Sequence, residues 1–328
     1  MNKFKENNPQ PYVLEDASQA NWVDQYSPLW LNPFLKLSRW DRPIGTWLLM
    51  IPCFWGLGFA IISNDAKFSL TNVWLYLAFF LGSILMRGAG CTWNDINDRK
   101  FDSLVKRTMF RPIPSGQISV RHAIIWMIAQ VFVSFLILLT FNNYAILVGI
   151  IALIPLFIYP YAKRFTWWPQ IFLGIAFNWG VLLAYSAQTG KIDLPAVILY
   201  FSGIFWTLYY DTIYAHQDAE DDALIGVKST ARLFGKNSKK WLLCFIAICG
   251  ILMELSFYLA LNSKPKEFII VSTLSIIAFA LHLLNQLRTL DINNSASCLS
   301  LFKSNKRSGL IIVFSLLLQL FLIKGFYS

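Results

Sequence analysis

Long apolar runs alternate with short polar stretches along most of the chain after residue 43. A membrane-spanning helix needs roughly 20 consecutive, mainly apolar residues. Nine segments fit this pattern, although the eighth is short: residues 44–63, 73–93, 122–141, 143–162, 169–189, 194–214, 241–262, 267–284 and 308–327. The pattern therefore predicts an all-α integral membrane protein, a bundle of nine transmembrane helices whose polar loops on one side form the site.

The first 36 residues differ from the rest because they contain no long apolar run. They include Glu6, Glu15, Asp16 and Asp24, which fits neither a secretory signal nor an Arg-rich, acid-poor transit peptide. We expect a polar cytoplasmic tail over residues 1–36, with an interfacial piece at "SPLWLNPFLKL", and a nine-helix transmembrane domain over residues 37–328.

The amino-acid composition supports the prediction of a membrane protein. The 328-residue chain is 56% hydrophobic and 14% charged, whereas soluble domains carry about 25% charged residues. The net charge of +10 could indicate a nucleic-acid partner. With the N-terminus in the cytoplasm, however, 22 of the 28 Lys and Arg residues lie in inside segments and 5 lie outside. This positive-inside bias explains the charge and predicts membrane lipid, not nucleic acid, as the partner. The polar tail without a secretory signal or transit peptide favours a bacterial inner membrane as the location.

An acidic cluster follows the second predicted span, in "CTWNDINDRKFDSLVKRT" at residues 91–108. If the helix continues past the span, Asn94, Asp98 and Asp102 lie within about 80° of one face, and Asp95 lies about 60° from Asp98. Oxygen ligands without His or Cys suit a hard cation such as Mg²⁺.

A second acidic cluster follows the sixth predicted span, in "YYDTIYAHQDAEDDALIGVKSTARLFG" at residues 209–235. Asp218 and Asp222 are spaced i, i+4, Asp221 lies beside them, and Tyr214 precedes them. Carboxylates about 4 Å apart repel by about 4 kcal/mol at an effective dielectric constant of 20. Mg²⁺ bound between both clusters and a pyrophosphate would relieve this repulsion. The alternative is two solvated loops whose aspartates pair with neighbouring Lys and Arg.

Basic residues on the same predicted side could contact such a pyrophosphate, because Arg and Lys are the usual phosphate-binding side chains. The candidates are Lys106, Arg107, Arg111, Lys163, Arg164 and Lys228. Each could equally serve the positive-inside bias alone. Arg87 lies inside a predicted span, where a charge is costly and usually functional, although its side chain could also snorkel to the interface.

Several motifs resemble the UbiA superfamily of intramembrane prenyltransferases. "NDINDRKFD" is similar to that superfamily's NDxxDxxxD motif, and "DAEDD" to its second aspartate motif. The segments "RPIG" (42–45), "RPIPSG" (111–116), "YPYAKRFTWWPQIFLGIAFNWG" (159–180) and "YYDTIYAHQDAEDDALIGVKSTA" (209–231) resemble the branch that acts in ubiquinone biosynthesis. The resemblance covers about residues 37–310.

This resemblance implies an activity: Mg²⁺-dependent transfer of a polyprenyl group from polyprenyl diphosphate to the ring of 4-hydroxybenzoate, ortho to the hydroxyl. Asp95, Asp98, Asp218 and Asp222 would be catalytic. The implied Mg²⁺ ligands are Asn94, Asp95, Asp98, Asp102, Asp218 and Asp222. The implied substrate-binding residues are Arg42, Arg87, Asn94, Asp102, Lys106, Arg107, Lys163, Arg164, Tyr214, Asp221 and Lys228, with Arg42 a candidate for the aromatic carboxylate.

Two competing readings stay open at this point. Another UbiA-type enzyme could prenylate a different acceptor. A cation-coupled transporter could use intramembrane acids, but that class favours acids near the membrane midplane and broken helices in both halves, whereas the acids here lie at predicted span ends.

Overall fold

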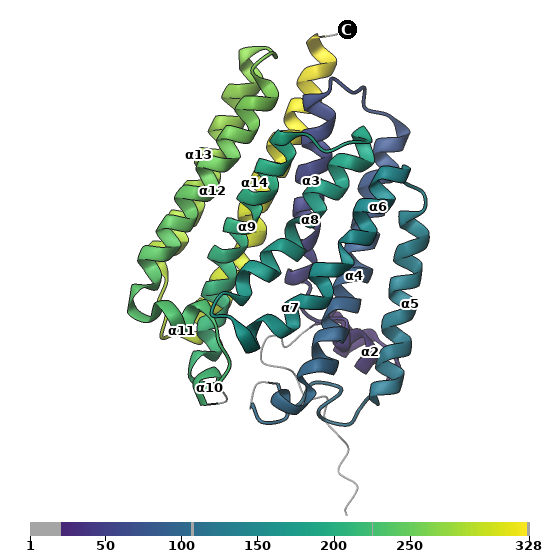
Figure 1. Ribbon diagram of the computed structural model, residues 1–328, viewed down its shortest axis with the longest axis vertical. Coiled ribbons are helices and arrows are strands. Elements are labelled where there is room, and N and C mark those ends of the chain that lie inside the picture. The colour runs from purple at the N-terminus through teal and green to yellow at the C-terminus, as the bar shows by residue number, and fades with distance from the viewer. Residues whose placement is uncertain (1–20, 106–107, 225, 327–328) are drawn as a thin grey trace, which may run out of the picture. The chain divides into compact units, whose positions relative to one another are not determined.

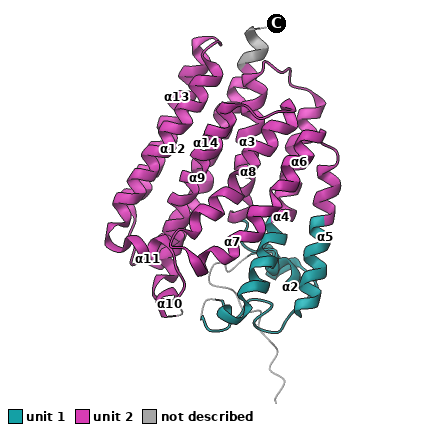
Figure 2. Ribbon diagram, viewed as in Figure 1, with its two compact units in different colours: residues 1–43, 87–131 teal, residues 44–86, 132–328 magenta. Residues whose placement is uncertain are grey.

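The computed structural model describes residues 21–105, 108–224 and 226–326, without the side chains of residue 221 and residues 322–326. The described residues fold into helices joined by turns, with no strand among them. They form two compact units, residues 1–43 with 87–131 and residues 44–86 with 132–328 (Figure 2).

The helices have the following bounds: α1 Trp22–Tyr26, α2 Asn32–Leu37, α3 Ile44–Ser63, α4 Leu70–Asp102, α5 Val120–Leu138, α6 Asn143–Ile151, α7 Leu153–Phe165, α8 Pro169–Thr189, α9 Leu194–Ala215, α10 Ala219–Leu224, α11 Thr230–Phe234, α12 Ser238–Leu261, α13 Lys266–Thr289 and α14 Ser295–Phe326. Two 3₁₀ turns, η1 His216–Asp218 and η2 Gly235–Asn237, connect the elements after α9.

Six helices of the second unit pack in a closed ring. Around it α3 contacts α8, α8 contacts α9, α9 contacts α12, α12 contacts α13, α13 contacts α14, and α14 returns to α3. Figure 1 shows α12 and α13 side by side at one edge of this unit. Because both faces of α3 and α9 meet other helices, these two carry much of the buried apolar surface.

Two tryptophans, one on α3 and one on α9, connect the helices of this unit. Trp55 and Trp206 stack with ring centroids 4.9 Å apart. The indole N–H of Trp55 donates to the Gly309 carbonyl at 2.9 Å, and that of Trp206 donates to Asn305 Oδ1 at 3.1 Å. Asn305 Nδ2 in turn donates to Gln286 Oε1 at 3.2 Å. Polar groups placed in an apolar interior are thus satisfied by neighbouring helices, as a membrane bundle requires.

Eight helices within the described residues are long and apolar enough to cross a membrane. They correspond to the first eight predicted spans, and α14 contains the ninth, residues 308–327, as far as the structure describes it. The fourth predicted span differs in detail, because it is broken into α6 and α7 at Ala152. Pro155 explains the break: it has no N–H for the carbonyl of Ile151, and its ring collides with that carbonyl in a regular helix.

We predict that Gly56→Ala strongly destabilises the protein. A Cβ atom at Gly56 would lie 2.3 Å from the carbonyl oxygen of Val181, so α3 and α8 must separate to accommodate it. Overpacking of this kind costs about 1–3 kcal/mol. Thermal unfolding of the purified protein should show a lower midpoint. Gly250→Ala is the control, because nothing lies within 4 Å of a Cβ there; equal midpoints for the two variants would contradict the packing argument.

The first unit holds α1, α2, the end of α4 and the start of α5. The expected polar tail is helical over part of its length, since α1 and α2 lie within residues 22–37. Lys36 Nζ pairs with Asp24 Oδ1 at 2.6 Å, and both side chains are less than 10% exposed. Burial alone would raise the pKa of Asp24, but the hydrogen bonds from Lys36, Asn21 and Asn32 and the charge of Lys36 together lower it. Whether a domain boundary lies at residue 37 stays a prediction.

Candidate active site

The first aspartate motif lies at the end of one continuous helix. Residues 91–102 contain no Gly or Pro, so α4 continues beyond its apolar part to Asp102, as the sequence predicts. Asp95, Asp98 and Asp102 are 0%, 1% and 7% exposed, and Asn94 is half-buried. Carboxylates buried to this degree need positive partners nearby.

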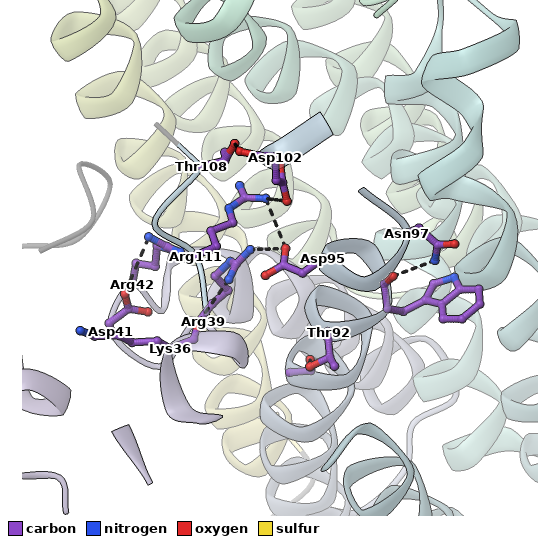
Figure 3. A network of polar contacts seen from close by, with 12 residues as sticks. Lys36, Arg39, Asp41, Arg42, Thr92, Asp95, Asn97, Asp102, Thr108 and Arg111 are labelled. Atoms are coloured by element: carbon purple, nitrogen blue, oxygen red, sulfur yellow. Dashed lines mark hydrogen bonds and ion pairs between the residues drawn. The ribbon is translucent and has the colours of Figure 1, made fainter. Parts of the chain in front are cut away.

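Two arginines from other segments supply positive charge to this motif (Figure 3). Arg39, between α2 and α3, places Nη2 2.6 Å from Asp95 Oδ1. Arg111 directs Nη1 to the same oxygen at 3.2 Å and to Asp102 Oδ2 at 2.9 Å. Burial disfavours a charged guanidinium, yet attraction to Asp95 outweighs it and raises the pKa of Arg39. Sequence reasoning gave Arg39 no role, because it looks like any positive-inside residue before a span.

Arg42 and Arg87 both belong to the first unit. Arg42 lies directly before α3, with Nη1 3.7 Å from Asp41 Oδ2 and its side chain 9% exposed. Burial raises the pKa of Asp41, although the charges of Arg42 and Arg39 oppose this shift. Arg87 is half-buried on α4, seven residues before Asn94. Arg87 thus lies on the helix that carries the first motif, and Arg42 lies three residues after Arg39, which contacts Asp95 of that motif.

The second aspartate motif starts where α9 gives way to a 3₁₀ turn. Tyr214 lies in the last turn of α9, Asp218 ends η1, and Asp222 lies on α10. A 3₁₀ turn advances about 120° per residue instead of 100°, so η1 rotates the later aspartates by about 60° relative to a regular helix. The Tyr214 ring packs against Phe302 with centroids 4.5 Å apart. Because the residues after Asp218 are α-helical, Asp218 and Asp222 keep their i, i+4 relation, and the rotation changes only their direction relative to Tyr214 on α9.

Three predicted basic residues of the second unit come from the last turn of α7 and from the loop between α10 and α11, which are joined by hydrogen bonds. The backbone N–H of Lys228 donates to the carbonyl of Lys163 at 3.1 Å, and Lys228 Nζ donates to the carbonyl of Phe165 at 3.4 Å. Arg164 follows Lys163 at the end of α7, with its guanidinium 5.2 Å from the Tyr161 ring centroid. Residues more than 60 positions apart thus contribute Lys163, Arg164 and Lys228 to one basic surface.

Arg232 is a further residue that sequence reasoning missed. Its Nη1 donates to the carbonyl of Val227 and, at 3.2 Å, to that of Asp222. Its guanidinium lies 5.3 Å from the centroid of the Trp167 ring. Arg232 therefore holds the loop after the second motif and connects it to the α7–α8 turn. The sequence did not predict this pair, because Trp167 and Arg232 lie far apart along the chain and neither belongs to an aspartate motif.

Some predicted residues cannot be placed. Lys106 and Arg107 lie outside the described residues, and Asp221 lies on α10 with its side chain not described. Among the described side chains, no three from His, Cys, Asp or Glu converge in a way that could hold a metal ion. Within the described residues, the predicted ligands of the first motif lie on α4, and those of the second lie on η1 and α10.

The chain is an all-helical, multi-pass membrane protein with two aspartate-rich motifs, each accompanied by basic residues. These features place it in the class of membrane-embedded enzymes that act on diphosphate esters of lipids. A family model described as the UbiA prenyltransferase family matches residues 49–314. The chain belongs to this family, which confirms the resemblance seen in its motifs.

Curated relatives share sequence with the chain, and solved structures share its fold. The chain is 45% identical to the mitochondrial 4-hydroxybenzoate polyprenyltransferase of Bos taurus, over 94% of this chain and 80% of the relative. It is 42% identical to the enzyme of the same name in Homo sapiens, over 94% and 81%. A UbiA homologue from Aeropyrum pernix K1 has a TM-score of 0.68 at 24% identity, covering 83% of this chain and 97% of that one. One from Archaeoglobus fulgidus bound to DMAPP and Mg²⁺ has a TM-score of 0.64 at 21% identity, covering 88% and 99%; both show likeness of fold.

Proposed function

We propose that the protein transfers a polyprenyl group from polyprenyl diphosphate to the ring of 4-hydroxybenzoate, ortho to the hydroxyl, with release of diphosphate, as a step of ubiquinone biosynthesis. The observation that carries this proposal is the 42–45% identity over about 90% of the chain to enzymes named for that reaction. The allylic C–O bond breaks with its electron pair going to diphosphate, a ring carbon forms the new C–C bond, and that carbon loses its proton.

The donor set of the two motifs fits Mg²⁺. It consists of amide and carboxylate oxygens alone, the ligands that Mg²⁺ prefers. Asn94, Asp98 and Asp102 would hold one ion and Asp218 with Asp222 another, with Asp95 assigned to the first set by sequence. Mg²⁺ usually keeps waters and shares its coordination with substrate phosphates, which is consistent with the lack of a closed, protein-only site among the described residues. When bound, Mg²⁺ neutralises the charge that develops on the departing diphosphate.

The basic surface of the second unit would contact the diphosphate directly. Lys163, Arg164 and Lys228 are its described members, and Lys106 and Arg107 are proposed for the same role from sequence. Fixed positive charges aimed at a developing anion are a major source of catalysis. Tyr214 and Asp221 stay proposed substrate-site residues, since they neighbour the second motif on α9 and α10.

The acceptor makes two demands on the site: its ring must be electron-rich, and its carboxylate needs a positively charged anchor. We assign the carboxylate to Arg42, whose guanidinium can form a two-pronged contact, and propose Arg87 as a lining residue near it. An Arg42→Ala protein with an unchanged KM for 4-hydroxybenzoate would remove Arg42 from this role. The runner-up function is prenylation of a different aromatic acceptor by the same site.

A product assay tests the proposal. Membranes containing the protein are incubated with Mg²⁺, geranyl diphosphate and 4-hydroxybenzoate, and the product is identified by mass. We expect the geranylated acid together with released diphosphate. Methyl 4-hydroxybenzoate serves as the matched acceptor, since it lacks only the negative charge; equal use of both would contradict an anchored carboxylate, and prenylation of other rings alone would favour the runner-up.

The protein is a multi-pass membrane protein, and we propose a bacterial inner membrane with the N-terminus in the cytoplasm. The concentration of Lys and Arg in alternate loops supports this orientation. The similar curated enzymes are named as mitochondrial, so the proposed location rests on the sequence of this chain and not on its relatives.

A further inference from the structure

Arg39 adopts a backbone conformation that residues with a side chain rarely take. Its φ is +62°, and only one other described non-glycine residue, Asp65, has a positive φ. The left-handed conformation carries a steric penalty for any residue with a Cβ, so it persists only where surrounding contacts hold it. Those contacts are visible: Nη1 donates to the carbonyl of Lys36 at 3.2 Å, and Nη2 contacts Asp95 at 2.6 Å.

Asp95 is the point where two such contacts meet. Its Oδ1 accepts from both Arg39 and Arg111, and the side chain is 0% exposed (Figure 3). Arg111 also reaches Asp102, so two guanidiniums are balanced by two carboxylates. Buried charges are tolerated when they are paired in this way. The two guanidiniums and the two carboxylates carry equal and opposite formal charges, and the second oxygen of Asp95, Oδ2, is buried without a hydrogen-bond partner among the described residues.

Helix geometry separates this group from the rest of the motif. At 100° per residue, Asp95 and Asp102 point within about 20° of each other, whereas Asn94 lies about 100° from Asp95. Asp98 lies between, about 40° from Asn94. The arginine contacts thus occupy the Asp95–Asp102 edge of α4, and Asn94 with Asp98 form the adjacent edge.

A divalent cation at Asp95 would face electrostatic repulsion. Oδ1 is already bound by two guanidiniums, so a cation would have to bind Oδ2, which is buried and has no hydrogen-bond partner of its own in the part of the chain that the structure describes. There it would lie beside two positive charges that repel it at short range. This repulsion does not arise for a residue that only anchors arginines.

We propose that Asp95 is a positioning residue and not a metal ligand. It neutralises Arg39 and Arg111, thereby fixing the turn before Arg42 and the segment 108–118 against the end of α4, and so sets the orientation of the edge that carries Asn94 and Asp98. The metal-binding role of Asp98 in this proposal rests on the proposed function. The role of Asp95 in stability is independent of that function.

Thermal unfolding of the purified full chain distinguishes the two roles. Midpoints are measured in EDTA and again with Mg²⁺ and inorganic diphosphate. Asp95→Asn should lower the EDTA midpoint by about 5 °C or more, because two buried guanidiniums lose their counter-charge, yet keep an upward shift on adding Mg²⁺ and diphosphate. Asp98→Asn, the same change one turn away, is the matched variant and should lose the upward shift without that drop in EDTA.

The energetic coupling between Arg39 and Asp95 provides a second measurement. Arg39→Met should cost less stability in the Asp95→Asn background than in the unsubstituted protein, since the contact is already lost. Should Asp95→Asn give no folded protein, Arg39→Lys replaces it: it keeps the charge but cannot hold both Asp95 and the Lys36 carbonyl, so its EDTA midpoint should fall while the shift persists.

An unchanged EDTA midpoint in Asp95→Asn, together with loss of the Mg²⁺-dependent shift, would overturn the proposal and restore Asp95 as a metal ligand. So would an Arg39→Lys protein as stable as the unsubstituted one. If the unsubstituted protein itself shows no shift with Mg²⁺ and diphosphate, the metal step of the proposed function fails, while the midpoints in EDTA still decide the role of Asp95.

Discussion

Asp98→Ala and Asp218→Ala should each reduce turnover by about 10²- to 10³-fold or more while the protein still inserts into membranes. Each change removes one carboxylate from a different aspartate motif, and stabilising the charge of a departing diphosphate is the main catalytic effect available to such a site. Initial rates of prenyl transfer in membranes of matched protein content give the measurement. EDTA should silence the unsubstituted protein, and added Mg²⁺ should restore it.

The second motif offers a control for this experiment. Glu220 lies on α10 between Asp218 and Asp222 and is exposed. Glu220→Ala removes a carboxylate of the same segment without touching the proposed ligands, so its rate should stay within about twofold of the unsubstituted rate, as surface substitutions usually do. A loss in Glu220→Ala equal to that in Asp218→Ala would show that overall acidity, not specific ligands, matters.

Arg232→Ala should raise the KM for prenyl diphosphate about 10- to 100-fold. The change removes two hydrogen bonds from a charged donor to the carbonyls of Asp222 and Val227 and the stacking on Trp167. Hydrogen bonds to charged groups contribute about 1.5–3 kcal/mol each, so the loop that carries Lys228 and follows Asp222 loses its anchor. Steady-state kinetics with varied prenyl diphosphate provide the test.

Two further variants separate anchoring from charge. Arg232→Lys keeps the charge but loses the planar fork, so it should recover only part of the affinity. Lys236→Ala removes an exposed positive charge nearby in sequence and should leave the KM unchanged. Full recovery by lysine, or an equal effect at Lys236, would mean that Arg232 acts through net charge.

The sequence was most informative where one physical rule dominates. Length and apolarity fix which segments can cross a membrane, so most spans were predicted within a few residues, although α14 begins at Ser295 and not near residue 308. The i, i+4, i+8 spacing of Asn94, Asp98 and Asp102 predicted that α4 continues past its apolar part. The break between α6 and α7 was missed because hydrophobicity alone does not register the lost N–H of Pro155. The rotation introduced by η1 was missed for a similar reason, since composition does not distinguish a 3₁₀ turn from an α-helical one.

The candidate site could be predicted by residue type, but not by pairing. The aspartates of both motifs stand out in an apolar chain, whereas Arg39, Arg111 and Arg232 differ from other basic residues only in what they contact. The Arg39–Asp95 pair joins positions 56 apart, and the Arg232–Trp167 pair positions 65 apart. Spacing within a motif carries no information on such long-range contacts, and only the folded chain assigns them.

The hydrogen bonds from Trp206 through Asn305 to Gln286 also bear on how this bundle assembles. In a bilayer each helix can insert first and dock afterwards, and lipid tails compete with apolar side chains on nearly equal terms. Apolar surfaces therefore discriminate weakly between one rotation of a helix about its axis and another. A single chain of directional bonds through α9, α14 and α13 favours the one rotation in which all three partners meet, so it specifies the docked arrangement as a key residue specifies the register of a coiled coil.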